Sequence, residues 1–403
     1  QQTALDATLN GSTIDIAGVG TTAALAFTGD ASIADTDPSI DAASLIQSLV
    51  PDQAAAGASL LIAAGRFVNQ GTILANGPAG SSFTVDVVPS GTGSAAVPGT
   101  FINDGTIMVD AGNTMTLAIA GGAALYNVGD IVVNGGSLLI NAGHGALDGG
   151  DAPVAGQVQI SGGGTVETNA GYAADLSGII PNFAFTDASA GNTLKIDNIA
   201  SFGGGIAGFG QHDTIDLGTS LAIAGLSYNA ASSILSLANA SGTILASVLL
   251  GGGFQTGSFA VTGGTADGFT IGTGADGDTI LTTSAATNVY LNGGADWQTA
   301  TAWSNGVPAT SGVAFIGRGA HAPFTLTTGN TPVSIGAVAI ASPLALLQIT
   351  SATTAAPGMS HVFSGTLEVT GGNTLTAAGI TAYGGSLQVD AGAVLDFTGH
   401  EVY

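Results

Sequence analysis

The chain has 403 residues, of which 45% are hydrophobic and 7% charged, and its formal net charge is −24. Arg66, Lys195 and Arg318 are the 3 basic residues against 27 acidic ones, so the basic surface that nucleic-acid binding requires is missing and nucleic acid is excluded as a partner. The hydrophobic fraction is ample for a packed core, and so low a density of charge excludes a disordered acidic polymer.

The counts of glycine and cysteine narrow the fold further. The 65 glycines imply many turns, because glycine opposes helix and adopts positive φ readily. The chain has no cysteine, so an exported form would depend on packing and hydrogen-bonded ladders rather than on disulfides. No apolar run reaches the roughly 18 residues of a membrane helix, and no membrane-spanning helix is expected.

A short pattern recurs along the chain: Ser or Thr, an aliphatic residue, alternating positions, then a small residue and Gly. The copies are GSTIDIAG at 11–18, GASLLIAAG at 57–65, GTIMVDAG at 105–112, GGSLLINAG at 135–143, GGTVETNAG at 163–171, GTLEVTGG at 365–372 and GGSLQVDAG at 384–392. Aliphatic residues two positions apart are typical of a strand with one buried face. We therefore expect pairs such as Leu60 and Ile62, or Leu387 and Val389, to point into a shared core.

One helix is predicted near the N-terminus, over residues 38–50. Asp37 followed by Pro38 is a capping pair, an apolar face with the spacing of a helix follows, and Pro51 ends it. We expect this helix to be an insertion in, or a cap on, the β-structure.

A second pattern, N-x-G-x-I, occurs in FVNQGTI, FINDGTI and YNVGDI, where the asparagines are Asn69, Asn103 and Asn127. Asn and Gly suit a turn that enters a strand, and stacked coils would let the asparagines form a ladder. The alternative is three independent hairpin turns in a sandwich. Repetition of aromatic residue, turn and strand together favours a solenoid.

The distribution of repeats and loop signals along the sequence predicts three parts. They are a β-solenoid over 1–171 with the helix near 38–50, a β-rich continuation or decorating domain over 172–284, and a second β-solenoid block over 285–403. In the middle part strand runs alternate with loop signals. The last part begins with the segment that holds both tryptophans, Trp297 and Trp303.

The N-x-G-x-I and G-[ST]-[LIV] units resemble those of haemagglutinin-type and autotransporter-passenger repeats, which build β-solenoid surface proteins of Gram-negative bacteria. The resemblance covers roughly residues 1–170 and 330–400. It implies a parallel right-handed β-helix, export to the cell surface or beyond it, and a role in adhesion, biofilm or surface architecture. It carries over no catalytic residue.

Metal binding has one candidate, Asp276 and Asp278 in GTGADGDTI at 272–280, which is similar to the calcium-binding nonapeptide of parallel β-rolls. Such a site needs successive turns to complete its shell of oxygen ligands. The alternative interpretation is a pair of ordinary solvated loop aspartates. No other cofactor is expected.

Catalysis is not expected. Only 3 Lys or Arg residues exist to neutralise an acidic sugar or to take a proton, and the best pair of carboxyls, Asp148 and Asp151, lies in a glycine-rich turn. We therefore predict a non-catalytic structural or adhesive protein, extracellular or on the bacterial cell surface, that self-assembles into a filament or surface layer and has surface polysaccharide as a candidate partner. The alternative is a secreted carbohydrate-binding or carbohydrate-degrading β-helix enzyme, marked by a groove on its flank.

Assembly is expected at the chain ends, where a solenoid leaves strand edges unpaired. With a net charge of −24 and so few cations, contacts between copies would have to be apolar or backbone contacts, in segments such as Thr13–Ala17 and Val394–Phe397.

Overall fold

The protein is described by a computed structural model. The structure describes residues 3–5, 13–16, 23–28, 39–40, 45–48, 57–63, 66–89, 99–120, 123–127, 129–142, 147–148, 157–168, 183–187, 191–202, 204–229, 232–251, 257–261, 265–266, 268–283, 287–291, 296–304, 306–308, 313–317, 323–352, 354–382 and 385–398.

The fold is an all-β parallel β-solenoid of about 10 turns, which confirms the fold class predicted from the repeats. The described helical residues form two short 3-10 turns, η2 (Ile199–Ser201) and η3 (Ala300–Ala302). The chain divides into two compact units, the first comprising 1–175, 192–203 and 215–218 and the second 176–191, 204–214 and 219–403.

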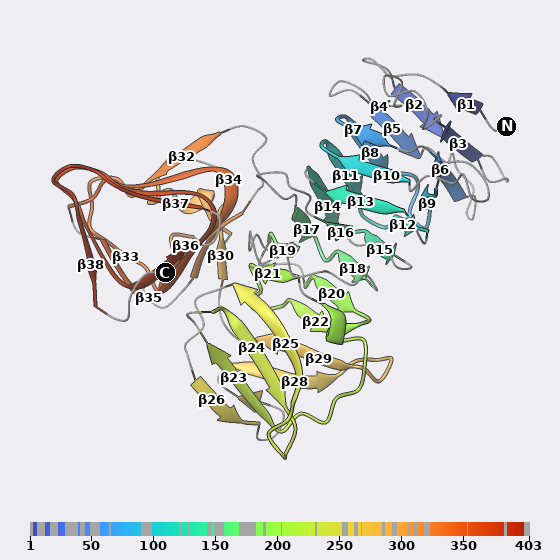
Figure 1. Ribbon diagram of the computed structural model, residues 1–403. Coiled ribbons are helices and arrows are strands. Elements are labelled where there is room, and N and C mark those ends of the chain that lie inside the picture. The colour runs from blue at the N-terminus through green and yellow to red at the C-terminus, as the bar shows by residue number, and fades with distance from the viewer. Residues whose placement is uncertain are drawn as a thin grey trace. The chain divides into compact units, whose positions relative to one another are not determined.

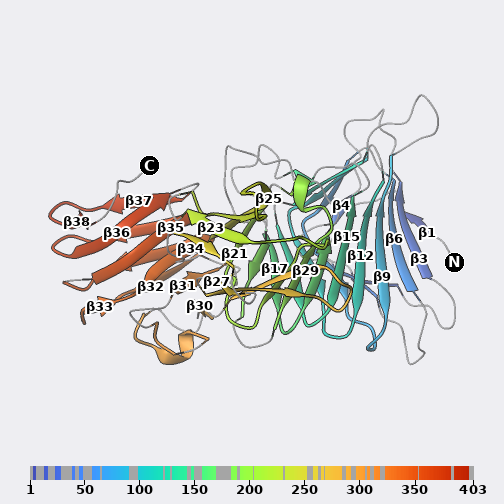
Figure 2. The ribbon, with the colours of Figure 1, turned by 90° about the horizontal axis from the view of Figure 1, so that it is seen from below.

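The first unit stacks three parallel sheets, to which each full turn adds one strand apiece (Figures 1 and 2). The first sheet contains β1 (Thr3–Leu5), β3 (Ala23–Thr28), β6 (Gly57–Ala63), β9 (Ser82–Val87), β12 (Thr114–Ile119), β15 (Ser137–Ala142), β18 (Thr165–Thr168), β20 (Thr193–Ile196) and β22 (Thr214–Asp216), whose last two residues belong to this unit. The second sheet contains β4 (Ser39–Ile40), β7 (Phe67–Asn69), β10 (Thr100–Asn103), β13 (Ala124–Asn127) and β16 (Leu147–Asp148). The third sheet contains β2 (Thr13–Ile16), β5 (Leu45–Ser48), β8 (Thr72–Ala75), β11 (Thr106–Val109), β14 (Asp130–Asn134) and β17 (Gln157–Ser161).

Alternate residues of these strands fill the core, as the spacing of the aliphatic pairs predicted. Leu60 and Ile62 are fully buried, and Ile107 is buried in register with Ile73 and Ile131 on the strands below and above it. Parallel pairing in this register places equivalent residues of successive turns on top of one another. A single short repeat, used again in each turn, can therefore specify the layers of the core.

The N-x-G-x-I motif forms a buried ladder at the corner between the second and third sheets. Asn69 donates from Nδ2 to Oδ1 of Asn103 at 2.7 Å, and Asn103 donates in the same way to Asn127 at 2.7 Å. The glycines stack beside them, and a Cβ added to Gly105 would lie 2.2 Å from the carbonyl oxygen of Gly71. The predicted ladder of asparagines is therefore confirmed, and glycine is required here because of close backbone approach.

The aromatic residue of that motif keeps its place in only two of the three copies. Phe67 and Phe101 are paired in register and pack edge to face with ring centroids 5.5 Å apart. In the third copy Leu125 takes this inward position, and Tyr126 lies in register with Ile102. The sequence order Tyr-Asn instead of Phe-x-Asn moves the ring to the other face of the strand, because side chains alternate.

The helix predicted over residues 38–50 is wrong for the part of that segment that the structure describes. Residues 39–40 form β4 and 45–48 form β5; the other residues of the segment lie outside the described residues. Ile46 stands in register with Ile14 and Ile73. Pairing on both sides satisfies the backbone groups of β5, and this tertiary pairing overrides the local capping and spacing signals.

The second unit contains a mixed sheet, a short antiparallel sheet and a final parallel block. The mixed sheet contains β19 (Phe183–Phe185), β21 (Gly205–Ala207), β25 (Ile244–Gly251), β24 (Ile234–Ala238), β23 (Gly225–Asn229) and β26 (Gly257–Ala260), in this spatial order. The antiparallel sheet contains β27 (Thr265–Ala266), β28 (Phe269–Thr273) and β29 (Thr279–Thr283). The final block contains β30 (Thr287–Val289), β31 (Val313–Ile316), β32 (Phe324–Thr327), β33 (Val333–Ser334), β34 (Ala337–Ile349), β35 (Thr354–Val369), β36 (Thr374–Ala382), β37 (Ser386–Val389) and β38 (Val394–Phe397).

Long bent strands build the final block. The first part of β34 pairs with β31 and its last part with β32, while β35 pairs with β34, β36 and β37 (Figure 1). The two tryptophans lie in its core: Trp297 and Trp303 are buried with ring centroids 4.5 Å apart, and Trp303 Nε1 donates to the carbonyl oxygen of Trp297 at 3.0 Å. Both rings belong to the hydrophobic core of this block, to which large aromatic side chains contribute much of the buried apolar area.

Candidate functional site

The predicted metal residues Asp276 and Asp278 lie in the loop that joins β28 to β29. Gly277, with φ +94°, allows the tight turn, and Gly274 N–H donates to the carbonyl oxygen of Asp278 at 2.8 Å. Asp276 Oδ1 accepts the backbone N–H of Asp278 at 3.2 Å, and carboxylate oxygens of the two residues lie within 4.8 Å of one another. The loop therefore brings the two side chains together.

This pair supplies part of a calcium shell. Ca²⁺ takes about 6 to 8 oxygen ligands, and the loop offers two carboxylates, one exposed and one half-buried, beside its own carbonyl groups. Antiparallel hairpin strands carry the pair, whereas the β-roll nonapeptide repeats on successive parallel turns. Calcium at Asp276 and Asp278 stays a prediction.

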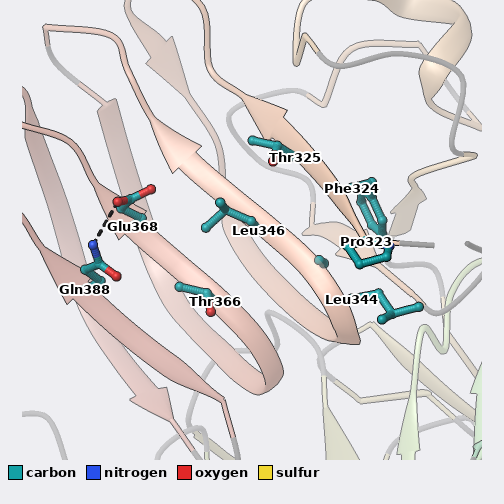
Figure 3. Close-up of a pocket in the computed structure, with 9 residues that line it drawn as sticks. Pro323, Phe324, Thr325, Leu344, Leu346, Thr366, Glu368 and Gln388 are labelled. Carbon is teal, nitrogen blue, oxygen red and sulfur yellow. Dashed lines mark hydrogen bonds between the residues drawn. The ribbon is translucent and has the colours of Figure 1, made fainter.

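A second candidate is a groove on the outer face of the final block, where β32, β34, β35 and β37 lie side by side (Figure 3). Its volume is about 400 Å³, and its lining residues are Pro323, Phe324, Thr325, Leu344, Ala345, Leu346, Thr366, Glu368 and Gln388. One end is apolar and the other is polar, with Leu346 between them. A concave surface with an apolar floor and a few fixed polar groups is the usual form of a small-ligand site.

The polar end of the groove, Glu368 and Gln388, belongs to a hydrogen-bonded row that continues to Gln348 and crosses three neighbouring strands. Gln348, Glu368 and Gln388 are paired in register. Gln348 Nε2 donates to Glu368 Oε2 at 2.5 Å. Gln388 Nε2 donates to Glu368 Oε1 at 2.9 Å, the bond that Figure 3 marks with a dashed line. Both carboxylate oxygens accept a bond from an amide, so the orientation of Glu368 is fixed.

Sequence reasoning missed this row, although the repeats contained its signal. Glu368 and Gln388 occupy the same place in GTLEVTGG and GGSLQVDAG, and they come 20 residues apart. Two planar polar side chains at one outward position of successive copies predict a ladder on the surface. The repeats revealed the core positions because nearly all of those are aliphatic, with Thr168 as an exception, whereas the outward positions vary in chemistry.

The last described turn forms a third candidate surface. Ile349, Val369 and Val389 share one register position, yet Ile349 and Val369 are buried while Val389 is 44% exposed. Leu395 and Phe397 on β38 are likewise only half-buried. In the described part of the chain no further strand pairs with β37 or β38, so residues in core register are left at the surface.

Of the predicted pair of carboxyls, Asp148 ends β16, and Asp151 lies outside the described residues. No helix in the described part of the chain is long and apolar enough to cross a membrane.

No family model, no curated protein and no solved structure matches the chain. The β-solenoid fold therefore stands on the strand pairing itself, and membership of the bacterial surface proteins stays a prediction from the resemblance of the repeats.

Proposed function

We propose that the chain is a non-catalytic structural or adhesive protein of the bacterial cell surface or extracellular space, which self-associates end to end. The observation that carries this proposal is the exposure of an apolar residue in core register on the last described turn. Val389 has the register of the buried Val369 but is 44% exposed, and exposed strand edges with apolar side chains are templates for pairing with another chain.

Charge constrains how copies would meet. At a net charge of −24, two copies repel each other once they approach to within about a Debye length, about 8 Å at physiological salt, because salt screens their charges at larger separations. Attraction must then come from backbone pairing and apolar packing, because the chain has 3 basic residues with which to form ion pairs. Added salt or divalent cations should therefore promote assembly.

The test is light scattering of the purified protein over a salt series, comparing wild type with Val389→Asp. A carboxylate at this position adds repulsion where packing is required, and the variant should remain smaller than wild type at every salt concentration. Ile244→Asp is the matched control, because Ile244 is 53% exposed on β25, away from the last turn in sequence and in pairing.

End association is refuted if wild type remains monomeric throughout, or if Val389→Asp assembles as fully as wild type and the Ile244→Asp control. Electron microscopy of the same samples would distinguish a filament from a sheet.

A further inference from the structure

We propose that the groove over β32, β34, β35 and β37 binds a neutral, extended β-linked glycan. This inference deepens the proposed adhesive role and rests on it, since a site of this kind would tie a non-catalytic rod to surface polysaccharide. It is carried by the fixed row of Gln348, Glu368 and Gln388 beside an apolar floor.

The row offers the hydrogen-bond chemistry of a sugar site. Gln348 uses one N–H on Glu368 and keeps a second N–H and its carbonyl oxygen for a ligand. Gln388 donates to both Glu368 and Asp390 and keeps its carbonyl oxygen, and the Glu368 carboxylate retains further acceptor capacity. Sugar hydroxyls both donate and accept, so they match a row that mixes the two. Because the amides already hold the carboxylate in place, little side-chain entropy is lost on binding.

The floor of the groove offers an apolar surface on which the apolar face of the same ligand can pack. Leu346 lies at the middle of the groove, between Thr325 and Thr366 on the neighbouring strands, and Pro323 and Leu344 extend the apolar surface toward the far end (Figure 3). A pyranose ring presents C–H groups on its faces and hydroxyls at its rim. It can therefore cover Leu346 while its rim reaches Glu368.

Geometry favours a linear polymer. Successive members of the row stand on adjacent strands, about 4.8 Å apart, which is close to the length that one pyranose adds to an extended β-linked chain. A glycan lying across the strands would meet Gln348, Glu368 and Gln388 with successive sugar units. The volume of about 400 Å³ falls within the usual range of small-ligand sites, about 300–1,000 Å³.

Other occupants fit less well. An extended peptide binds a sheet by adding a strand at an edge, but the floor here is a sheet face, in which β34 is paired with β32 and β35. An anionic ligand would meet Glu368 and Asp390 in a chain of net charge −24. A cationic ligand would be attracted by charge, and its binding would weaken as salt is added.

The experiment is isothermal titration of the full chain with cellotetraose and with chitotetraose, at a protein concentration at which scattering shows only monomer. Wild type should bind at least one of the two saturably, with an affinity unchanged by added salt. Glu368→Leu and Leu346→Ser should each weaken binding about tenfold, through loss of charge-assisted hydrogen bonds and of the apolar floor respectively.

Asp396→Leu is the matched control, because it removes an exposed carboxylate from the same block on β38, outside the groove. It should bind as wild type does, and melting curves should show all variants folded. Absence of binding by wild type, equal binding by the groove variants, or binding of spermidine in place of either glycan would overturn the proposal. Such a failure leaves end association intact, because assembly is measured separately by scattering. Conversely, a wild type that remains monomeric at every salt concentration refutes end association and leaves glycan binding intact.

Discussion

Asn69 and Asn103 are 34 residues apart in sequence, yet the side-chain amide of the first donates to the side-chain oxygen of the second at 2.7 Å inside the solenoid. Both side chains are fully buried. Polar groups this deep in a core are tolerated only when they are bonded, so the ladder makes each turn depend on the turn beside it.

The substitution Asn103→Ala should therefore destabilise the first unit by about 1–3 kcal/mol, because it leaves the Asn69 amide and the Asn127 oxygen without this partner. Chemical denaturation followed by circular dichroism measures the change. Asn134→Ala, at an exposed position of β14, should change stability by about 0.5 kcal/mol or less. Equal effects of the two substitutions would show that the ladder contributes nothing specific.

The stacked glycines predict a second and larger effect. In Gly105→Ala the new Cβ would lie 2.2 Å from the carbonyl oxygen of Gly71, and backbone cannot yield there as a flexible side chain would. We expect a loss of at least about 3 kcal/mol or failure to fold. For comparison, Gly242→Ala has open space around the new methyl at φ +79° and should lose only about 1 kcal/mol. A Gly105→Ala protein with the melting temperature of wild type would contradict the close stacking of the turns.

Burial of His361 predicts a dependence of stability on pH. Burial lowers the pKa of His361 to about 4, from 6.5, because the charged imidazolium is disfavoured beside Ser233 and the stacked ring of Phe363. The unfolded chain then binds a proton more readily than the folded one between pH 6.5 and 4. The contribution of neutral, buried His361 to the free energy of unfolding is therefore complete above pH 6.5. It falls by about 3 kcal/mol in total as the pH drops to about 4.

His361→Gln removes the titration while keeping a polar side chain. The difference in unfolding free energy between wild type and His361→Gln should shrink by about 3 kcal/mol from pH 7 to pH 4. Taking this difference cancels the effect of the carboxyl groups, which titrate in both proteins. A difference that is constant with pH would mean that the pKa of His361 is the same in the folded and the unfolded protein, so that burial does not lower it.

Calcium at Asp276 and Asp278 is tested by chelation. A calcium ion bound only to the folded state stabilises that state by mass action. Removing the ion should therefore lower the melting temperature by several degrees. The double variant Asp276→Asn with Asp278→Asn should melt at the same temperature with and without chelator. If wild type also shows no response to excess chelator, the two aspartates are plain loop residues.

The sequence predicted the solenoid because its core residues repeat, and it predicted the asparagine ladder because Asn and Gly recur at fixed offsets. It predicted a helix wrongly near Ile46, since an apolar face with a cap and a following proline satisfies the local rules for a helix. What decides the conformation there is pairing with Ile14 and Ile73, partners far along the chain that no local window contains. The outward row of Gln348, Glu368 and Gln388 was not predicted from the sequence for a related reason. Only the fold shows that these three outward residues share one face.

Along the surface row of the final block the register is constant, and this sets which changes of length the row can tolerate. Gln348, Glu368 and Gln388 follow one another at intervals of 20 residues, so duplication or removal of one whole interval would return every later side chain to the face it had before. A single inserted residue within β35 would turn all that follow in that strand to the opposite face. Evolution or design could thus lengthen the block in whole turns, extending the surface row without altering the cross-section of the core.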